Sequence, residues 1–163
     1  MRYADTPTAQ VDVVVQAPAE RVWALITDVN LPARFSNEFR GVEWIDDGPA
    51  MDAHFRGRSE HPAIGQWETT CVVTRFEVNR VFEWAVGDAD HASAKWRFEI
   101  EPDAGGVRLT QWCQIGPAPS GLTPAILAMP DKEERIVARR LDEFRANMQA
   151  TIDGIKQIAE VTP

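Results

Sequence analysis

The sequence predicts an α+β domain in which a curved, seven-stranded antiparallel sheet wraps around one long C-terminal helix. Two observations lead to this prediction. Strand-like segments follow one another from residue 40 to 115 with only short turns between them, so neighbouring strands should pair antiparallel. Residues 131–159 then carry apolar side chains at helical spacing. A length of 163 residues suits a single domain, which we place at 1–163.

The N-terminal segment combines one strand with two short helices. Residues 1–8 show no apolar pattern and are expected to be frayed. Residues 10–16 contain VDVVV, a β-branched run that is typical of a strand. Pro18 and the acid after it indicate a helix start, and that helix should end near Asp28. The LPARF sequence at 31–35 predicts a second short helix.

The middle of the chain alternates apolar and polar residues between turn sequences rich in Asp, Asn, Gly and Pro. No helix-length segment interrupts this pattern, which excludes a parallel α/β sheet. Trp112 falls on the polar side of its strand, where alternation does not explain it. We expect strands at 41–47, 51–59, 66–77, 80–87, 92–101 and 106–115.

The C-terminal part begins with a Pro/Gly-rich connection at 116–130, within which 123–129 can form a short helical turn. Asp131 and Glu134 have the spacing of a capping box. A helix from 131 to 159 would be about 40 Å long at 1.5 Å per residue.

The order of these elements predicts a cavity. A helix about 10 Å wide cannot fill the concave side of a wide, curved sheet. Strand alternation places large aromatic side chains and almost no charge on that side. Each ring taken alone is compatible with a solid core, but the set together with the architecture favours a partly hollow interior.

Charge and composition limit the partners. The net charge of −8 argues against nucleic acid and anionic membrane surfaces, both of which attract clusters of Lys and Arg. The N-terminus has no secretory h-region, and no apolar run approaches the roughly 20 residues of a membrane helix. We therefore expect a cytoplasmic protein without stable membrane insertion. The sequence leaves the oligomeric state open, a homodimer included.

Few side chains suggest catalysis. His54, His61 and His91 are expected at the surface or in loops, and no metal-ligand spacing, Ser–His–Asp set or phosphate loop is found. We therefore expect neither a metal nor another cofactor. Gln111 is the best inward polar candidate, either as a satisfied core amide or as a ligand contact. Arg140 either reaches the cavity rim or is a solvated helix arginine.

Three stretches resemble one superfamily. VDVVVQAPAERVWALITDVNLPARF at 11–35, AHFRGRSE at 53–60 followed by Trp67, and NMQATIDGIKQIAE at 147–160 are similar to the START-like, or Bet v 1-like (SRPBCC), proteins. The similarity is to the bacterial polyketide cyclase/dehydratase-like branch. Ser59 stands where many relatives carry Asn. The resemblance implies the helix-grip fold with a tunnel-like cavity, in which relatives bind lipids, sterols, polyketides or quinones.

In that fold Cys71 and Cys113 would lie about 14 Å apart, so no disulfide is expected.

The function that follows is binding or transport of a small hydrophobic molecule: a lipid, polyketide or aromatic. Two alternatives are a cyclase/dehydratase-type enzyme using Gln111 and Arg140 or the loop histidines, and a regulatory protein-interaction module with a collapsed cavity. The 116–130 segment is the expected lid. The expected ligand-binding residues are Phe55, Trp67, Phe82, Trp84, Trp96, Phe98, Leu109, Gln111, Leu127, Met129, Arg140, Phe144 and Met148.

Overall fold

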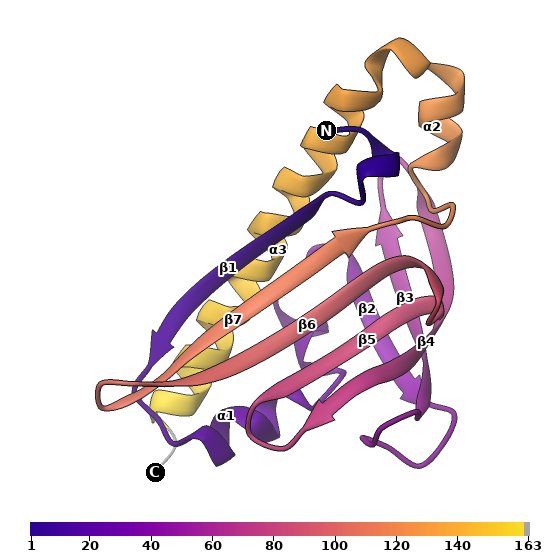
Figure 1. Ribbon diagram of the computed structural model, residues 1–163. Helices are drawn as coiled ribbons and strands as arrows, with labels where there is room; N and C mark the ends of the chain where they lie inside the picture. Colours follow the sequence, from indigo (N-terminus) through magenta and orange to yellow (C-terminus); the bar gives the residue numbers. More distant parts are fainter. Residues whose placement is uncertain (162–163) are drawn as a thin grey trace.

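Seven antiparallel strands form one sheet that curves around a long C-terminal helix (Figure 1). The computed structural model describes residues 1–161. The strand order is β1-β7-β6-β5-β4-β3-β2, so only the β1–β7 pair joins strands that are distant in sequence. The predicted fold class is confirmed. The strands are β1 (Thr8–Val15), β2 (Phe39–Trp44), β3 (His54–His61), β4 (Gly65–Glu77), β5 (Val81–Asp88), β6 (His91–Asp103) and β7 (Gly106–Ile115).

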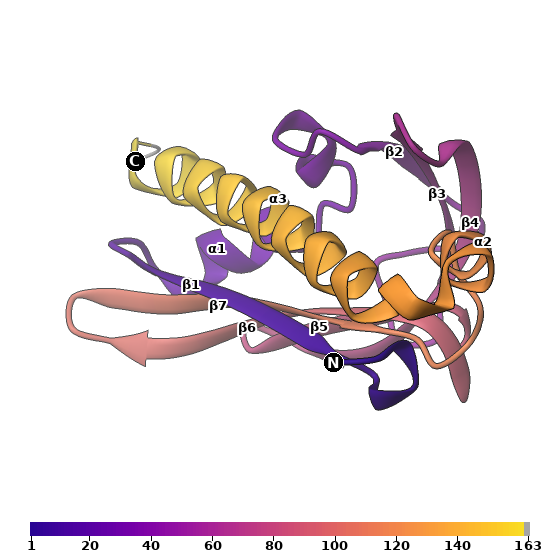
Figure 2. The ribbon, with the colours of Figure 1, turned by 90° about the horizontal axis from the view of Figure 1, so that it is seen from above.

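The main helix, α3 (Glu133–Val161), lies along the concave side of the sheet, with β2, β3 and β4 rising beside it (Figure 2). It begins two residues later than predicted because Pro130–Lys132 form a 3-10 turn, so Asp131 does not cap it. Two shorter helices are α1 (Ala19–Ile26) and α2 (Thr123–Ala128). Within residues 1–161, no helix combines the length and apolar character needed to cross a bilayer.

The first residues are held in place, and the expectation of a frayed segment at 1–8 was wrong. Tyr3–Asp5 form a 3-10 turn. The Tyr3 hydroxyl donates to the carbonyl of Ala118 at 2.5 Å, and its amide donates to Glu133 Oε2 at 2.9 Å. These partners lie 115 and 130 residues away in sequence, so no local sequence pattern predicts the contacts.

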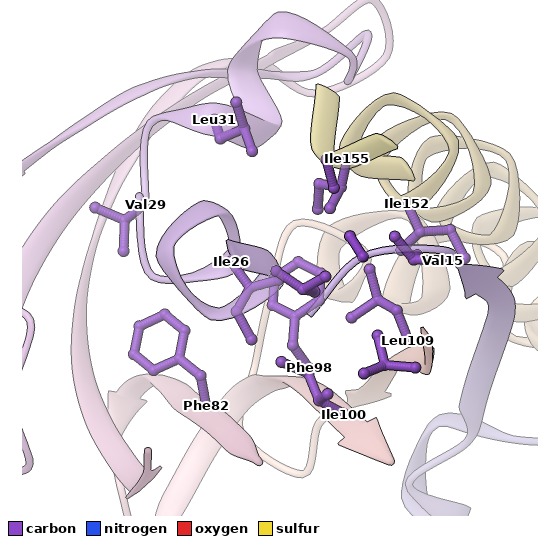
Figure 3. Close-up of a cluster of buried hydrophobic side chains, with 14 of the residues drawn as sticks. Val15, Ile26, Val29, Leu31, Phe82, Phe98, Ile100, Leu109, Ile152 and Ile155 are labelled. Carbon is purple, nitrogen blue, oxygen red and sulfur yellow. The ribbon is translucent and has the colours of Figure 1, made fainter. Parts of the chain in front are cut away.

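The solid part of the core lies where α1 packs against the C-terminal half of α3 (Figure 3). Ile152 and Ile155 are fully buried there beside Leu109 and Ile26. Gly154 allows α3 to pack closely against the Phe35 ring, because a Cβ at position 154 would lie 2.4 Å from Phe35 Cε1. A residue that costs helix propensity is therefore required by packing.

Trp112, which alternation left unexplained, is covered on the outer face by Arg97. The Arg97 guanidinium lies 4.1 Å from the centre of the indole ring. Arg97 also forms ion pairs with Glu83 and Glu99. A planar cation stacked on an aromatic face stabilises a ring at this partly exposed position.

Candidate ligand-binding cavity

A cavity of about 340 Å³ lies between the inner face of the sheet and the N-terminal half of α3. Strands β3 to β7 supply one wall, and α3 supplies the other through Arg140, Phe144, Asn147, Met148 and Thr151. The volume falls in the range of roughly 300–1,000 Å³ that is typical of small-molecule sites. The predicted hollow interior is therefore present.

Several aromatic rings stand in the cavity wall and contact one another. The Trp96 and Phe144 rings meet edge to face with centroids 5.0 Å apart, which joins β6 to α3. Trp84 stands between Phe55 and Phe98, with ring centroids 6.0 and 6.1 Å away. Rings in these tilted contacts present apolar edges and faces that suit a hydrophobic or aromatic guest.

Most of the predicted site residues line this cavity. Two others, Phe82 and Leu109, are fully buried but lie in the solid core beneath it. Strand alternation predicts which side of the sheet a residue faces. It does not predict whether the residue's position along the strand is next to the cavity or next to the solid core, and this explains both errors. The residues that line the cavity as predicted are Phe55, Trp67, Trp84, Trp96, Phe98, Gln111, Arg140, Phe144 and Met148.

The predicted lid is present only in part. Pro119, Ser120, Gly121 and Leu122 line the cavity, whereas Leu127 is 76% exposed and Met129 is 40% exposed, and neither lines it. The closing contact is to the β3–β4 turn, because a Cβ on Gly121 would lie 3.2 Å from Ile64 Cδ1.

Several lining residues were not predicted. Thr69 and Cys71 alternate in phase with Trp67 along β4, and Asn147 and Thr151 lie on the same face of α3 as Phe144 and Met148. These residues therefore could have been found from periodicity. Ser93 and Ile64 lie near strand ends, where the alternation gave no guide.

Gln111 carries an unsatisfied acceptor. Its side chain is 5% exposed, lines the cavity, and has no hydrogen-bond partner for Oε1 among the described residues. Its direct neighbours in the sheet are Phe98 and Val11, both apolar. An unmade hydrogen bond at a buried group costs about 1–3 kcal/mol, so this oxygen favours a partner.

A cluster of four polar residues, which we call the Arg140 cluster, adjoins the cavity. Arg140 Nη1 and Nη2 lie 2.5 and 2.8 Å from the two carboxylate oxygens of Glu38, and Nη1 lies 3.3 Å from Glu143. Glu143 in turn accepts from His61 Nε2 at 2.9 Å. Arg140 is therefore buried and paired, and its alternative interpretation as a solvated arginine was wrong.

His61 was expected to be a solvated loop residue, and this was also wrong. Its side chain is 13% exposed and bonded at both ring nitrogens. The Ala63 amide donates to Nδ1 at 3.0 Å, so the proton is on Nε2 and the ring is neutral. His54 and His91 are exposed, as expected.

The charge state of the Arg140 cluster follows from these bonds. Partial burial acts to raise the pKa of Glu143, but the His61 hydrogen bond and the Arg140 charge outweigh it, so the pKa lies below its ordinary value. Glu38, His61 and Glu143 are close enough to hold a metal ion. However, Arg140 occupies both carboxylates and His61 Nε2 carries a proton, so the arrangement is that of an ion-pair network.

The two cysteines are buried free thiols, and the prediction that they form no disulfide is confirmed. Burial raises the pKa of both Cys71 and Cys113 to about 12. Because the thiolate is the reactive form, neither residue is a nucleophile near neutral pH.

The fold and cavity define a helix-grip protein with a largely apolar cavity between sheet and helix. Residues 6–152 match the family described as polyketide cyclase / dehydrase and lipid transport, and the chain belongs to that family. No curated protein shows a significant match to this sequence.

Three solved structures are similar. The Polyketide_cyc-like protein Cgl2372 from Corynebacterium glutamicum is 31% identical, with 94% of this chain and 91% of that chain covered and a TM-score of 0.65. TTHA0849 from Thermus thermophilus is 14% identical, with 96% and 100% covered and a TM-score of 0.67. The di-domain ARO/CYC BexL from the BE-7585A biosynthetic pathway is 15% identical with a TM-score of 0.73; 97% of this chain is covered but only 51% of BexL. The latter two show the fold alone.

Proposed function

We propose that this protein binds, and releases elsewhere, a small hydrophobic or aromatic molecule held in the cavity under α3. The observation that carries this proposal is an internal space of about 340 Å³ whose wall is largely apolar and includes several aromatic rings. An empty apolar space forgoes dispersion contacts and costs stability, so a guest of matching shape would be stabilised by burial of its surface. The open cavity argues against a protein-interaction module with a collapsed interior.

Binding is favoured over cyclisation because the titratable groups in and beside the site are already engaged. Both nitrogens of His61 are bonded, Glu38 and Glu143 are paired with Arg140, and the Cys71 thiol stays protonated. A general acid or base needs a free site and a pKa near the working pH. Gln111 and Arg140 remain the residues on which an enzyme of the cyclase/dehydratase type would depend.

Gln111 indicates which functional group the ligand should carry. Its partnerless oxygen lies in an apolar surrounding, where a ligand hydroxyl could donate to it. The ligand that fits best is a flat or branched hydrocarbon skeleton with a hydrogen-bond donor.

Two measurements test the proposal. Organic extraction of the purified protein followed by mass spectrometry should yield a co-purified apolar molecule. Titration with 9-anthracenemethanol should quench the fluorescence of the cavity tryptophans Trp67, Trp84 and Trp96.

A matched pair of variants on β4 shows where the probe binds. Thr69→Trp places an indole in the cavity, whereas Thr70→Trp places it on the exposed face of the same strand. Probe binding should be lost in the first variant and kept in the second. Equal binding by both variants would place the probe outside the cavity and contradict the proposal.

A further inference from the structure

We infer that the cavity selects uncharged ligands and rejects molecules that carry a carboxylate or phosphate, and that Glu38 sets this preference by occupying Arg140. The inference rests on the proposed function and narrows its ligand class.

The charges facing the cavity are few and mutually paired. Across residues 1–161, Glu38 and Arg140 are the only charged side chains that line it. Both are largely buried, with side chains 13% and 8% exposed. The guanidinium meets the Glu38 carboxylate with two parallel hydrogen bonds, a geometry that uses both of its terminal nitrogens. No unpaired cation is therefore left on the described wall for an anionic ligand.

The surroundings of Arg140 make an additional anion still less favourable. Nη1 also contacts Glu143, which is ionised at neutral pH and is hydrogen-bonded by a neutral His61. One guanidinium thus faces two carboxylates, and the cluster carries excess negative charge. One face of the guanidinium also packs on the Phe144 ring, with Cζ 4.4 Å from the ring centre, so that side is covered as well.

The energetic consequence follows from desolvation. An ionised carboxylate that leaves water for an apolar site without a partner is strongly disfavoured, and a like charge nearby adds to this. The net charge of −8 opposes approach of anions as well. An alcohol meets no such penalty and can donate to Gln111 Oε1. Neutral hydroxylated aromatics and alcohols are therefore favoured over fatty acids and phospholipids.

A pair of probes with one skeleton tests this on the unmodified protein. We expect 9-anthracenemethanol to bind at least tenfold more tightly than 9-anthracenecarboxylate at pH 7.5, measured by tryptophan quenching and calorimetry. Equal affinities, or tighter binding of the carboxylate, would overturn the inference while leaving the proposed function standing. If neither probe binds, the proposed function fails and the inference fails with it.

A charge-neutralising variant tests the role of Glu38. Glu38→Gln should free Arg140 and raise affinity for the carboxylate probe at least tenfold, with less than a threefold change for the alcohol. Glu43→Gln is the control, because it removes the same charge from an exposed residue of β2 that pairs with Arg56 outside the cavity. Equal affinities of the two variants for the carboxylate would refute the assignment to Glu38. Glu38→Ser, which also removes the carboxylate that occupies Arg140, serves as a second neutralising variant if Glu38→Gln fails to fold.

Discussion

His61 Nε2 lies 2.9 Å from Glu143 Oε2, and this bond ties the end of β3 to the middle of α3. It spans the part of the molecule where helix and sheet are separated by the cavity rather than by packed side chains. This hydrogen bond therefore connects α3 to the sheet here, as apolar side-chain contacts do elsewhere along the helix.

Removing this tie should destabilise the fold modestly. We expect His61→Ala to lower the free energy of unfolding by about 1 kcal/mol, the usual contribution of a partly buried hydrogen bond. Urea denaturation followed by circular dichroism measures it. His54→Ala is the control, since its partner Asp46 is half exposed and the pair lies at the surface. Equal losses in both variants would argue against a special role for the tie.

Acid should weaken the protein partly through Glu143. Folding lowers the pKa of this carboxyl below its ordinary value of about 4.3, so its contribution is fully present above that pH. The contribution is lost as the pH falls through the lower folded-state value. Between pH 5 and pH 3 the wild type should therefore lose more stability than Glu143→Gln does. Parallel pH–stability curves for the two proteins would contradict this.

Alanine at position 154 should destabilise the helix, although alanine favours helices. Its Cβ would lie 2.4 Å from Phe35 Cε1, so the ring or the helix must move. We expect Gly154→Ala to cost about 1–3 kcal/mol, as overpacking usually does. The reverse change at an exposed helix position, Ala146→Gly, should also destabilise, by about 1 kcal/mol through helix propensity alone. Adding Phe35→Ala should make the Gly154→Ala change tolerable, and thermal denaturation of the double variant against Phe35→Ala alone tests this.

Gln111 should affect stability and binding in opposite directions. Replacing it with Leu removes an unsatisfied buried acceptor, so the free protein should be no less stable and should gain up to about 1–3 kcal/mol. Affinity for 9-anthracenemethanol should fall about tenfold, while affinity for anthracene, which has no donor, should be unchanged. Unfolding curves and fluorescence titrations measure the two effects. A loss of stability in Gln111→Leu would show that the amide is satisfied after all.

The cysteines should resist alkylation in the native protein. With thiol pKa values of about 12, iodoacetamide at pH 7.5 should label neither Cys71 nor Cys113 within an hour, and both should react once urea unfolds the chain. Intact-mass spectrometry counts the adducts. Rapid native labelling of Cys113, which does not line the cavity, would contradict the core as described.

The fold was predictable because its signals are local. Alternation along residues 92–101 and the three- and four-residue spacing after Asp131 depend only on neighbours in sequence. The errors at Tyr3 and His61, and the choice left open at Arg140, share one physical origin. Each of these side chains is fixed by a partner far away in sequence, namely Ala118, Glu143 or Glu38, and periodicity carries no information about such pairs.

Along α3 the structural roles are divided by position. Residues from Ile152 onward pack into the solid core with α1, whereas Arg140, Phe144 and Met148 face the hollow part of the molecule. A substitution near the hollow part can therefore alter which guest is accepted without dismantling the scaffold. One helix thus holds the scaffold together at one end and shapes the cavity at the other, so the two properties can be altered separately.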